Sequence, residues 1–209
     1  ETSGLENGYF TEEKKQQIES LAAEYQRVVQ QYIDLIWEDS SLSLNKETKS
    51  LVKDTSLSSR FRSNTVRLAL QICSNTRKSD KALEVEATKP EFDGTMILDA
   101  MFVFVSLDAP NYFDGWIHLS TLEKGEPIWI PFKRTKPLNK WLKRGCKLVQ
   151  SIRLRKYNNN WYADLILEKE VSLKQEGSFL GVDSGTKKAL SLSDNTHLGA
   201  NYRYYVYKI

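Results

Sequence analysis

Residues 177–195 read GSFLGVDSGTKKALSLSDN, and this stretch decides how the rest of the chain is interpreted. An apolar run leads to Asp183, Gly185 follows two positions later, and a second apolar run ends at Asp194 and Asn195. Two apolar runs joined through a glycine-containing turn predict a β-hairpin whose first strand ends at a carboxylate. The simpler interpretation is an aspartate that opens a surface turn.

Helices are predicted in the first part of the chain. Residues 11–38 repeat apolar side chains at the spacing of a helical face, and Thr11 can cap the start of this helix. A second helix is expected from about residue 58 to about residue 74. Residues 40–59 are rich in serine and lysine and are expected to hold a loop and a short helix.

Strands are predicted after a polar linker at residues 79–94, where the apolar period changes to two. The candidate strands are residues 95–107, 115–119, 127–132, 147–157 and 161–171. Residues 158–160, all asparagine, are expected to join the last two as a hairpin. Curved antiparallel strands in this number favour a small barrel, so the predicted fold class is α+β.

Positive charge is concentrated in the strand region, although the net charge of the chain is only +3. Residues 127–163 contain no acidic residue, and aromatic residues such as Trp129, Trp141 and Trp161 are interleaved with the basic ones. Neutralising phosphates releases counterions, and aromatic rings stack on unpaired bases, so this pattern predicts RNA binding. The RNA-binding candidates are Lys133, Arg134, Lys143, Arg144, Lys147, Arg153, Arg155 and Lys156. The simpler interpretation is a solvated basic face with tryptophans in the core, and Trp161 is expected to be a core residue.

The second predicted helix carries a further polar set. Its members are Arg60, Arg62, Asn64 and Arg67. Arginine and asparagine are side chains that read base edges in a DNA major groove, so these residues are DNA-binding candidates. A polar helix face that only contacts solvent has the same sequence pattern, and this is the simpler interpretation of these residues.

The sequence gives little support for a zinc site, a histidine site or a membrane-spanning segment. Cys73 and Cys146 are far apart and form no zinc motif, which indicates reduced thiols in a cytoplasmic protein. His118 and His197 are isolated in the sequence and are expected to be structural or solvated. No apolar run is long enough to cross a bilayer, so no membrane partner is predicted.

Three segments together resemble the amino-terminal half of the transposon-encoded TnpB nucleases and their descendants, the compact type V CRISPR effectors. Residues 58–64 look like the start of the family's recognition-lobe helix, and residues 141–168 are similar to the end of its wedge barrel. Residues 181–194, which carry Gly-Val-Asp-Ser-Gly, resemble the first RuvC motif and its hairpin.

The resemblance implies a helical recognition lobe (residues 1–78), a wedge-like antiparallel β-barrel (79–176) and the start of a RuvC-like RNase H fold (177–209). It implies a prokaryotic, cytoplasmic protein that uses guide RNA to bind a DNA duplex beside a short flanking motif. Asp183 would be the first catalytic aspartate and a ligand of Mg²⁺. A Mg²⁺-dependent DNA endonuclease is expected only if the remaining RuvC acids are present.

Departures from the family pattern leave alternatives open. The family's other catalytic carboxylates, its zinc ribbon and the short amino-terminal strand of its wedge are not recognised, and one aspartate cannot hold two metal ions. The sequence is therefore expected to be a piece of a longer nuclease. The alternatives are a truncated or nuclease-dead relative that binds guide RNA and target DNA without cutting, as a repressor or an assembly subunit, and a general RNA-binding barrel. A second copy of the chain is a further candidate partner.

Overall fold

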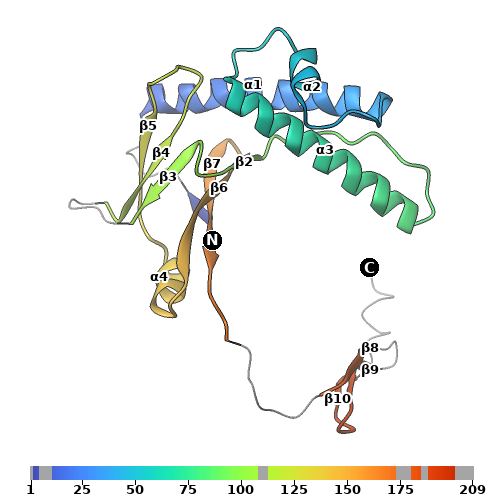
Figure 1. Ribbon diagram of the computed structural model, residues 1–209. Coiled ribbons are helices and arrows are strands. Elements are labelled where there is room, and N and C mark those ends of the chain that lie inside the picture. The colour runs from blue at the N-terminus through green and yellow to red at the C-terminus, as the bar shows by residue number, and fades with distance from the viewer. Residues whose placement is uncertain (1, 5–10, 108–112, 173–179, 185–187, 201–209) are drawn as a thin grey trace. The chain divides into compact units, whose positions relative to one another are not determined.

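The computed structural model describes residues 2–4, 11–107, 113–172, 180–184 and 188–200. The chain divides into two units, Glu1–Lys169 and Glu170–Ile209. The first unit combines helices with two antiparallel sheets, and the second contains a small antiparallel sheet (Figure 1). The α+β class predicted from the sequence is confirmed.

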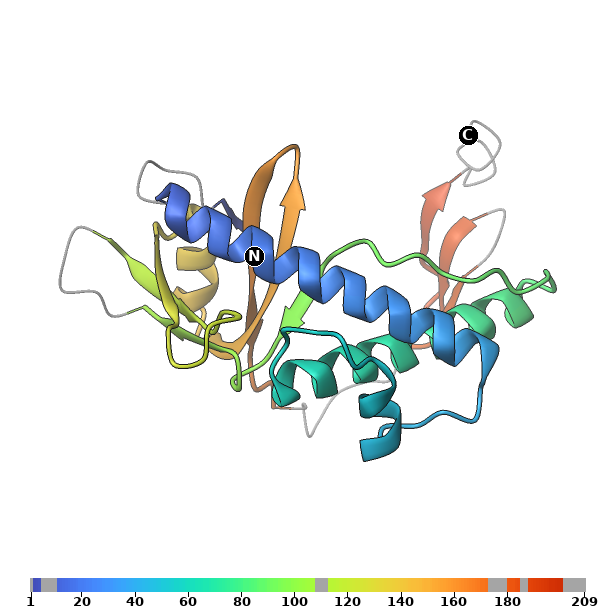
Figure 2. The ribbon, with the colours of Figure 1, turned by 90° about the horizontal axis from the view of Figure 1, so that it is seen from above.

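The helices form where the apolar period predicts them. Helix α1 (Glu12–Glu38) starts at Thr11, whose side chain accepts a hydrogen bond from the Lys14 amide at 3.4 Å. A short helix α2 (Lys46–Leu51) follows, and α3 (Ser59–Ala82) is capped in the same way by Ser58. Figure 2 shows α1 running along the first unit beside α3.

Helix α3 continues eight residues beyond its predicted end near residue 74. Arg77 explains the extension, because its Nη2 donates to the carbonyls of Ile36 and Trp37 at 3.0 and 3.1 Å. These carbonyls lie at the end of α1, where a cation satisfies acceptors that the helix itself leaves open. A contact with α1 therefore sets the end of α3, and this end cannot be predicted from the apolar periodicity of α3 alone.

One sheet of the first unit has the strand order β1-β7-β6-β2. Its strands are β1 (Thr2–Gly4), β2 (Met96–Leu98), β6 (Lys147–Tyr157) and β7 (Asn160–Glu168). The predicted hairpin between β6 and β7 is confirmed, and its turn residues Asn158 and Asn159 have φ values of +46° and +65°. Asparagine tolerates this left-handed conformation, which suits a two-residue hairpin turn.

The other sheet joins β3 (Val103–Ser106), β4 (Gly115–Leu119) and β5 (Ile128–Phe132). A single strand over residues 95–107 was the wrong prediction, because the chain turns at Asp99 and β2 and β3 enter different sheets. The Asp99 carbonyl accepts from the amides of Phe102 and Val103, and its carboxylate accepts from the Met101 amide. Helix α4 (Lys136–Lys143) then lies between β5 and β6.

Among the residues that the structure describes, the strands form open sheets and no barrel is closed. The β3 and β6 strands meet through the side chain of Gln150 instead of a strand ladder. Its Oε1 accepts from the Val105 amide at 2.7 Å, and its Nε2 donates to the Val105 carbonyl at 3.0 Å. The β6–β7 register shifts between Leu148 and Ile152, on either side of Gln150.

The sequence also led us to expect no short amino-terminal strand, and this expectation was wrong. Strand β1 pairs with β7, with Ser3 opposite Ala163. Strand β1 has three small residues and therefore shows no alternation of apolar and polar side chains. Its conformation is set by pairing with the edge of β7, which the sequence of residues 2–4 does not reveal.

The core of the first unit extends from the helices into both sheets. Phe61 of α3 lies at the junction, where its ring is 4.4 Å from the Phe102 ring and 6.5 Å from the Tyr25 ring of α1, between centroids. Trp161 is buried on β7, as predicted. The predicted helical lobe and the predicted strand region thus share one apolar core.

In the second unit, β8 (Val182–Ser184), β9 (Lys188–Leu192) and β10 (His197–Ala200) form a sheet in the order β10-β9-β8. The strand that carries Asp183 and its antiparallel partner are therefore confirmed. The turn that contains Gly185 lies outside the described residues. Strand β10 was not predicted from the sequence.

Candidate nucleic-acid interface

The clearest basic surface is built by α4 and the start of β6. We call it the α4–β6 surface, and it consists of the exposed residues Lys136, Lys140, Trp141, Lys143, Arg144 and Lys147. The three lysines of α4 are four and three residues apart and so lie along one side of the helix. The Arg144 guanidinium lies 5.1 Å from the centroid of the Trp141 ring, which is 44% exposed.

Local sequence explains why α4 forms despite its charge. Thr135 caps it by accepting from the Leu138 amide at 3.2 Å, Pro137 stands in the first turn, and Leu138 is fully buried. Lysines at this spacing repel one another, so a bound polyanion would relieve a destabilising interaction. This helix was not predicted from the sequence, although the Thr135 cap and Pro137 are signals of a helix start.

Other predicted RNA-binding residues are compensated by acids from other elements. The Arg155 guanidinium pairs with Asp164 at 3.1 Å, and the Lys156 amine pairs with Glu19 of α1 at 2.8 Å. Arg153 is exposed on β6, in register with Asp164. The charge of the β6–β7 hairpin is therefore partly neutralised, and Lys143, Arg144 and Lys147 are the predicted residues that gather on one surface.

Lys133 and Arg134 follow the end of β5, where Lys133 is half-buried and Arg134 is exposed. The Arg134 amide donates to the Asp114 carboxylate at 2.9 Å, which fixes the backbone there. These residues therefore lie between the β3–β4–β5 sheet and α4.

The predicted DNA-binding residues do not form a single face of α3. Arg60 and Arg67 are exposed, and their seven-residue spacing places them along one side of the helix. Asn64 lies between them, but it accepts from the Tyr25 hydroxyl at 2.5 Å and donates to the Ile97 carbonyl at 3.3 Å. Burial raises the pKa of Tyr25, which keeps this hydroxyl protonated. Arg62 is half-buried, and its Nε has no hydrogen-bond partner among the described residues.

Arg60 lies at the edge of a cleft of about 870 Å³. The start of α3 supplies Ser58, Ser59 and Arg60, and the opposite wall includes His118 and Lys124 from β4 and the turn that follows it. A ligand bound in this cleft, between the helices and the β3–β4–β5 sheet, would therefore contact Arg60.

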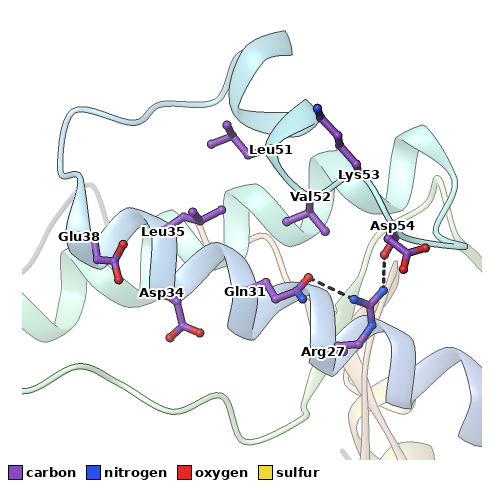
Figure 3. Close-up of a pocket in the computed structure, with 9 residues that line it drawn as sticks. All are labelled: Arg27, Gln31, Asp34, Leu35, Glu38, Leu51, Val52, Lys53 and Asp54. Carbon is purple, nitrogen blue, oxygen red and sulfur yellow. Dashed lines mark hydrogen bonds between the residues drawn. The ribbon is translucent and has the colours of Figure 1, made fainter.

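A second, smaller hollow of about 460 Å³ lies between α1 and the segment that leads to α3 (Figure 3). Arg27 crosses one end of it, donating to the Asp54 carbonyl at 2.6 Å and to Gln31 at 3.2 Å. Its neighbour Glu24 accepts from Arg27 and from Thr55 and Ser56, and these hydrogen bonds, led by Arg27, lower the pKa of Glu24 to about 2. The network anchors the approach to α3 and hence the position of Arg60.

This network predicts a measurable pH dependence. Because the pKa of Glu24 in the folded chain lies below its ordinary value of 4.5, its contribution is complete above that pH and is lost as the pH falls toward 2. After allowance for the half-exposed Arg27, we expect this loss to reach about 1–2 kcal/mol of unfolding free energy. Urea unfolding at several pH values should show a flatter acid decline for Glu24→Gln. The exposed carboxylate of Glu38 on the same helix provides the control, and an equal effect of Glu38→Gln would contradict the assignment.

Asp183 is exposed on β8, and the preceding Val182 is 58% exposed, so the apolar character of this strand does not bury it. Asp183 and His197 both lie in register with Ser191 of β9. Among the described residues, no group of three or more histidine, cysteine or acidic side chains could hold a metal ion. Since Mg²⁺ is held by several oxygen ligands, the described residues do not fit a Mg²⁺ site, and metal binding by Asp183 stays a prediction.

No model of a known protein family matches this chain, and no curated protein matches it either. None of the described helices has the length and apolar character needed to cross a membrane.

Proposed function

We propose that this chain is an RNA-guided DNA-binding protein of the TnpB and type V effector class, acting in the cytoplasm of a prokaryote. The observation that carries the proposal is the α4–β6 surface, which combines a row of exposed lysines on α4 with the exposed Trp141–Arg144 pair. Point charges on one side of a helix suit the phosphates of a guide RNA, and the exposed indole suits an unpaired base.

Target DNA is assigned to the start of α3 in this proposal. Arg60 and Arg67 are the exposed cations there, and the adjoining cleft has room for one edge of a DNA duplex near its flanking motif. Asn64 makes hydrogen bonds to Tyr25 and Ile97, and in this proposal it supports the helix and is not assigned to base reading. Arg62 is half-buried, and it is likewise not assigned to DNA binding in this proposal.

We propose DNA cleavage only on the condition that the protein also contains the remaining RuvC carboxylates. Asp183 would then be one of several carboxylates. In the alternative, the protein binds guided DNA without cutting it and acts as a repressor or as a subunit of an assembly. Cleavage that survives Asp183→Ala would exclude the RuvC assignment.

The proposal predicts that DNA binding depends on RNA. RNA that co-purifies with the protein would be identified, transcribed with a chosen guide segment, and returned to the RNA-free protein. A library of complementary duplexes with randomised flanks should then be retained only in the presence of this RNA and only with some flanks. Because good contacts to bases or phosphates are each worth roughly 1–3 kcal/mol, Arg60→Ala with Arg67→Ala should lower DNA retention by about ten-fold or more.

RNA affinity should be unchanged in the same double variant. Lys78→Ala, which removes an exposed cation from the far part of α3, is the matched control and should retain DNA normally. Equal DNA retention with and without RNA would reject guidance, and equal losses in Lys78→Ala would reject the assignment of the DNA site.

A further inference from the structure

The outer surface of the β3–β4–β5 sheet carries a row of rings, of which His118 also lines the cleft assigned to target DNA and the others do not. We call it the aromatic face, and it consists of Phe104, Trp116, His118 and Trp129. The opposite side of the same strands already fills the core with Val103, Val105, Ile117, Leu119, Ile128 and Ile130, all of which are buried. The outward rings are therefore not needed to complete that core.

Strand register explains why the rings lie together. Phe104 is opposite His118, and His118 is opposite Trp129, so three neighbouring strands each contribute one ring. The His118 and Trp129 rings are 4.5 Å apart, and Trp116 meets the edge of Trp129 at 6.5 Å, between centroids. Phe104 and Trp129 remain 51% and 47% exposed. Exposed apolar surface gathered in this way usually marks a binding site.

We propose that the aromatic face stacks unpaired bases of single-stranded RNA, a proposal that rests on the RNA-binding function proposed above. Rings spread across an antiparallel sheet can accept successive bases without reading their sequence, because every base has a π-face. At the edge of the sheet, the Lys14 amine donates to the Trp129 carbonyl at 2.6 Å and places a cation at the backbone of β5.

The charges around the β3–β4–β5 sheet indicate toward which end of β5 a bound RNA would continue. Glu123 and Glu126 lie in the turn before β5, where a hydrogen bond with the Glu126 carboxyl and then the repulsion between the two charges raise the pKa of Glu123. Lys133 and Arg134 follow the other end of β5, within the acid-free stretch that continues into α4. A strand of RNA that stacks on the rings would therefore continue past Arg134 to the α4–β6 surface, where its phosphates are neutralised.

Affinity measurements with a single strand and a duplex test this proposal. The probe is a fluorescein-labelled RNA of about 12 nucleotides, within the usual range of single-strand site sizes, alone or annealed to its complement. Phe104→Ala and Trp129→Ala should each lower single-strand affinity about ten-fold and leave duplex affinity unchanged. Trp129→Phe, which keeps a ring, should recover most of the loss. Leu83→Ala removes an exposed apolar side chain from the end of α3 and should have no effect.

The salt dependence separates this face from the α4–β6 surface. Stacking releases few counterions, so the loss in the ring variants should be the same at about 50 mM and about 200 mM salt. Unchanged single-strand affinity in both ring variants, or an equal loss for the duplex, would overturn the stacking proposal while leaving the proposed function intact. A shift of the RNA-free protein from dimer to monomer with unchanged RNA affinity would assign the face to a second copy and also overturn it. Failure of the parent protein to bind any RNA at low salt would overturn the proposed function itself.

Discussion

Replacing Lys136, Lys140 and Lys143 together by glutamate is expected to weaken RNA binding by at least about 100-fold at low salt. Each lysine is exposed on the same side of α4, so the triple change turns a favourable row of charges into a repulsive one. The loss should shrink as salt rises. If the lysines neutralise three phosphates, the slope of log affinity against log salt should become shallower by about 2 to 3 units.

A matched control keeps the change in net charge the same. Lys46, Lys53 and Lys78 are exposed elsewhere in the first unit, and their triple replacement by glutamate should alter RNA affinity only slightly. Fluorescence anisotropy at several salt concentrations measures both variants. Equal losses in the two would show that RNA responds only to net charge, and the α4–β6 surface would then not be a specific binding site.

Phe61→Ala is expected to lower the free energy of unfolding by about 3–5 kcal/mol, the usual cost of emptying a buried phenylalanine site. Its ring lies between Tyr25 of α1 and Phe102 before β3, so neither the helices nor the strands alone can fill the cavity. The aromatic contacts add to the simple loss of buried area.

Phe104→Ala provides the same chemical change at a half-exposed site of the aromatic face. We expect it to cost less than about 1 kcal/mol, in the range of surface substitutions. Urea unfolding followed by circular dichroism compares the two variants. A cost for Phe61→Ala as small as that for Phe104→Ala would contradict the junction that we assign to Phe61.

Regular periodicity made much of the fold predictable. The long apolar stripe and Thr11 predicted the bounds of α1, alternation along the whole of β4 predicted its bounds, and alternation in the second half of β6 together with the asparagine turn located the β6–β7 hairpin. Helix α4 was harder to find because it is short and Leu138 is its one fully buried residue. The break at Asp99 was missed because β2 and β3 have the same period, and only their different partners separate them.

The candidate site was less predictable, because charge is compensated between elements distant in the sequence. Glu19 neutralises Lys156 from 137 residues away, and Asp164 reaches Arg155 across the β6–β7 hairpin. Asn64 appeared free to read DNA until Tyr25, 39 residues earlier, was found to occupy its amide oxygen. The grouping of Phe104, His118 and Trp129 depends on strand register, which the sequence did not reveal.

Gln150 joins the two sheets of the first unit without a shared strand ladder. Each sheet has its own ladder of backbone hydrogen bonds, and this one amide bridges β3 and β6 through two hydrogen bonds to Val105, beside an apolar core to which both sheets contribute. A side-chain bridge of this kind does not fix the strand register of one sheet against the other. The spacing of the rings in one sheet is therefore not tied by a backbone ladder to the spacing of the cations beside the other.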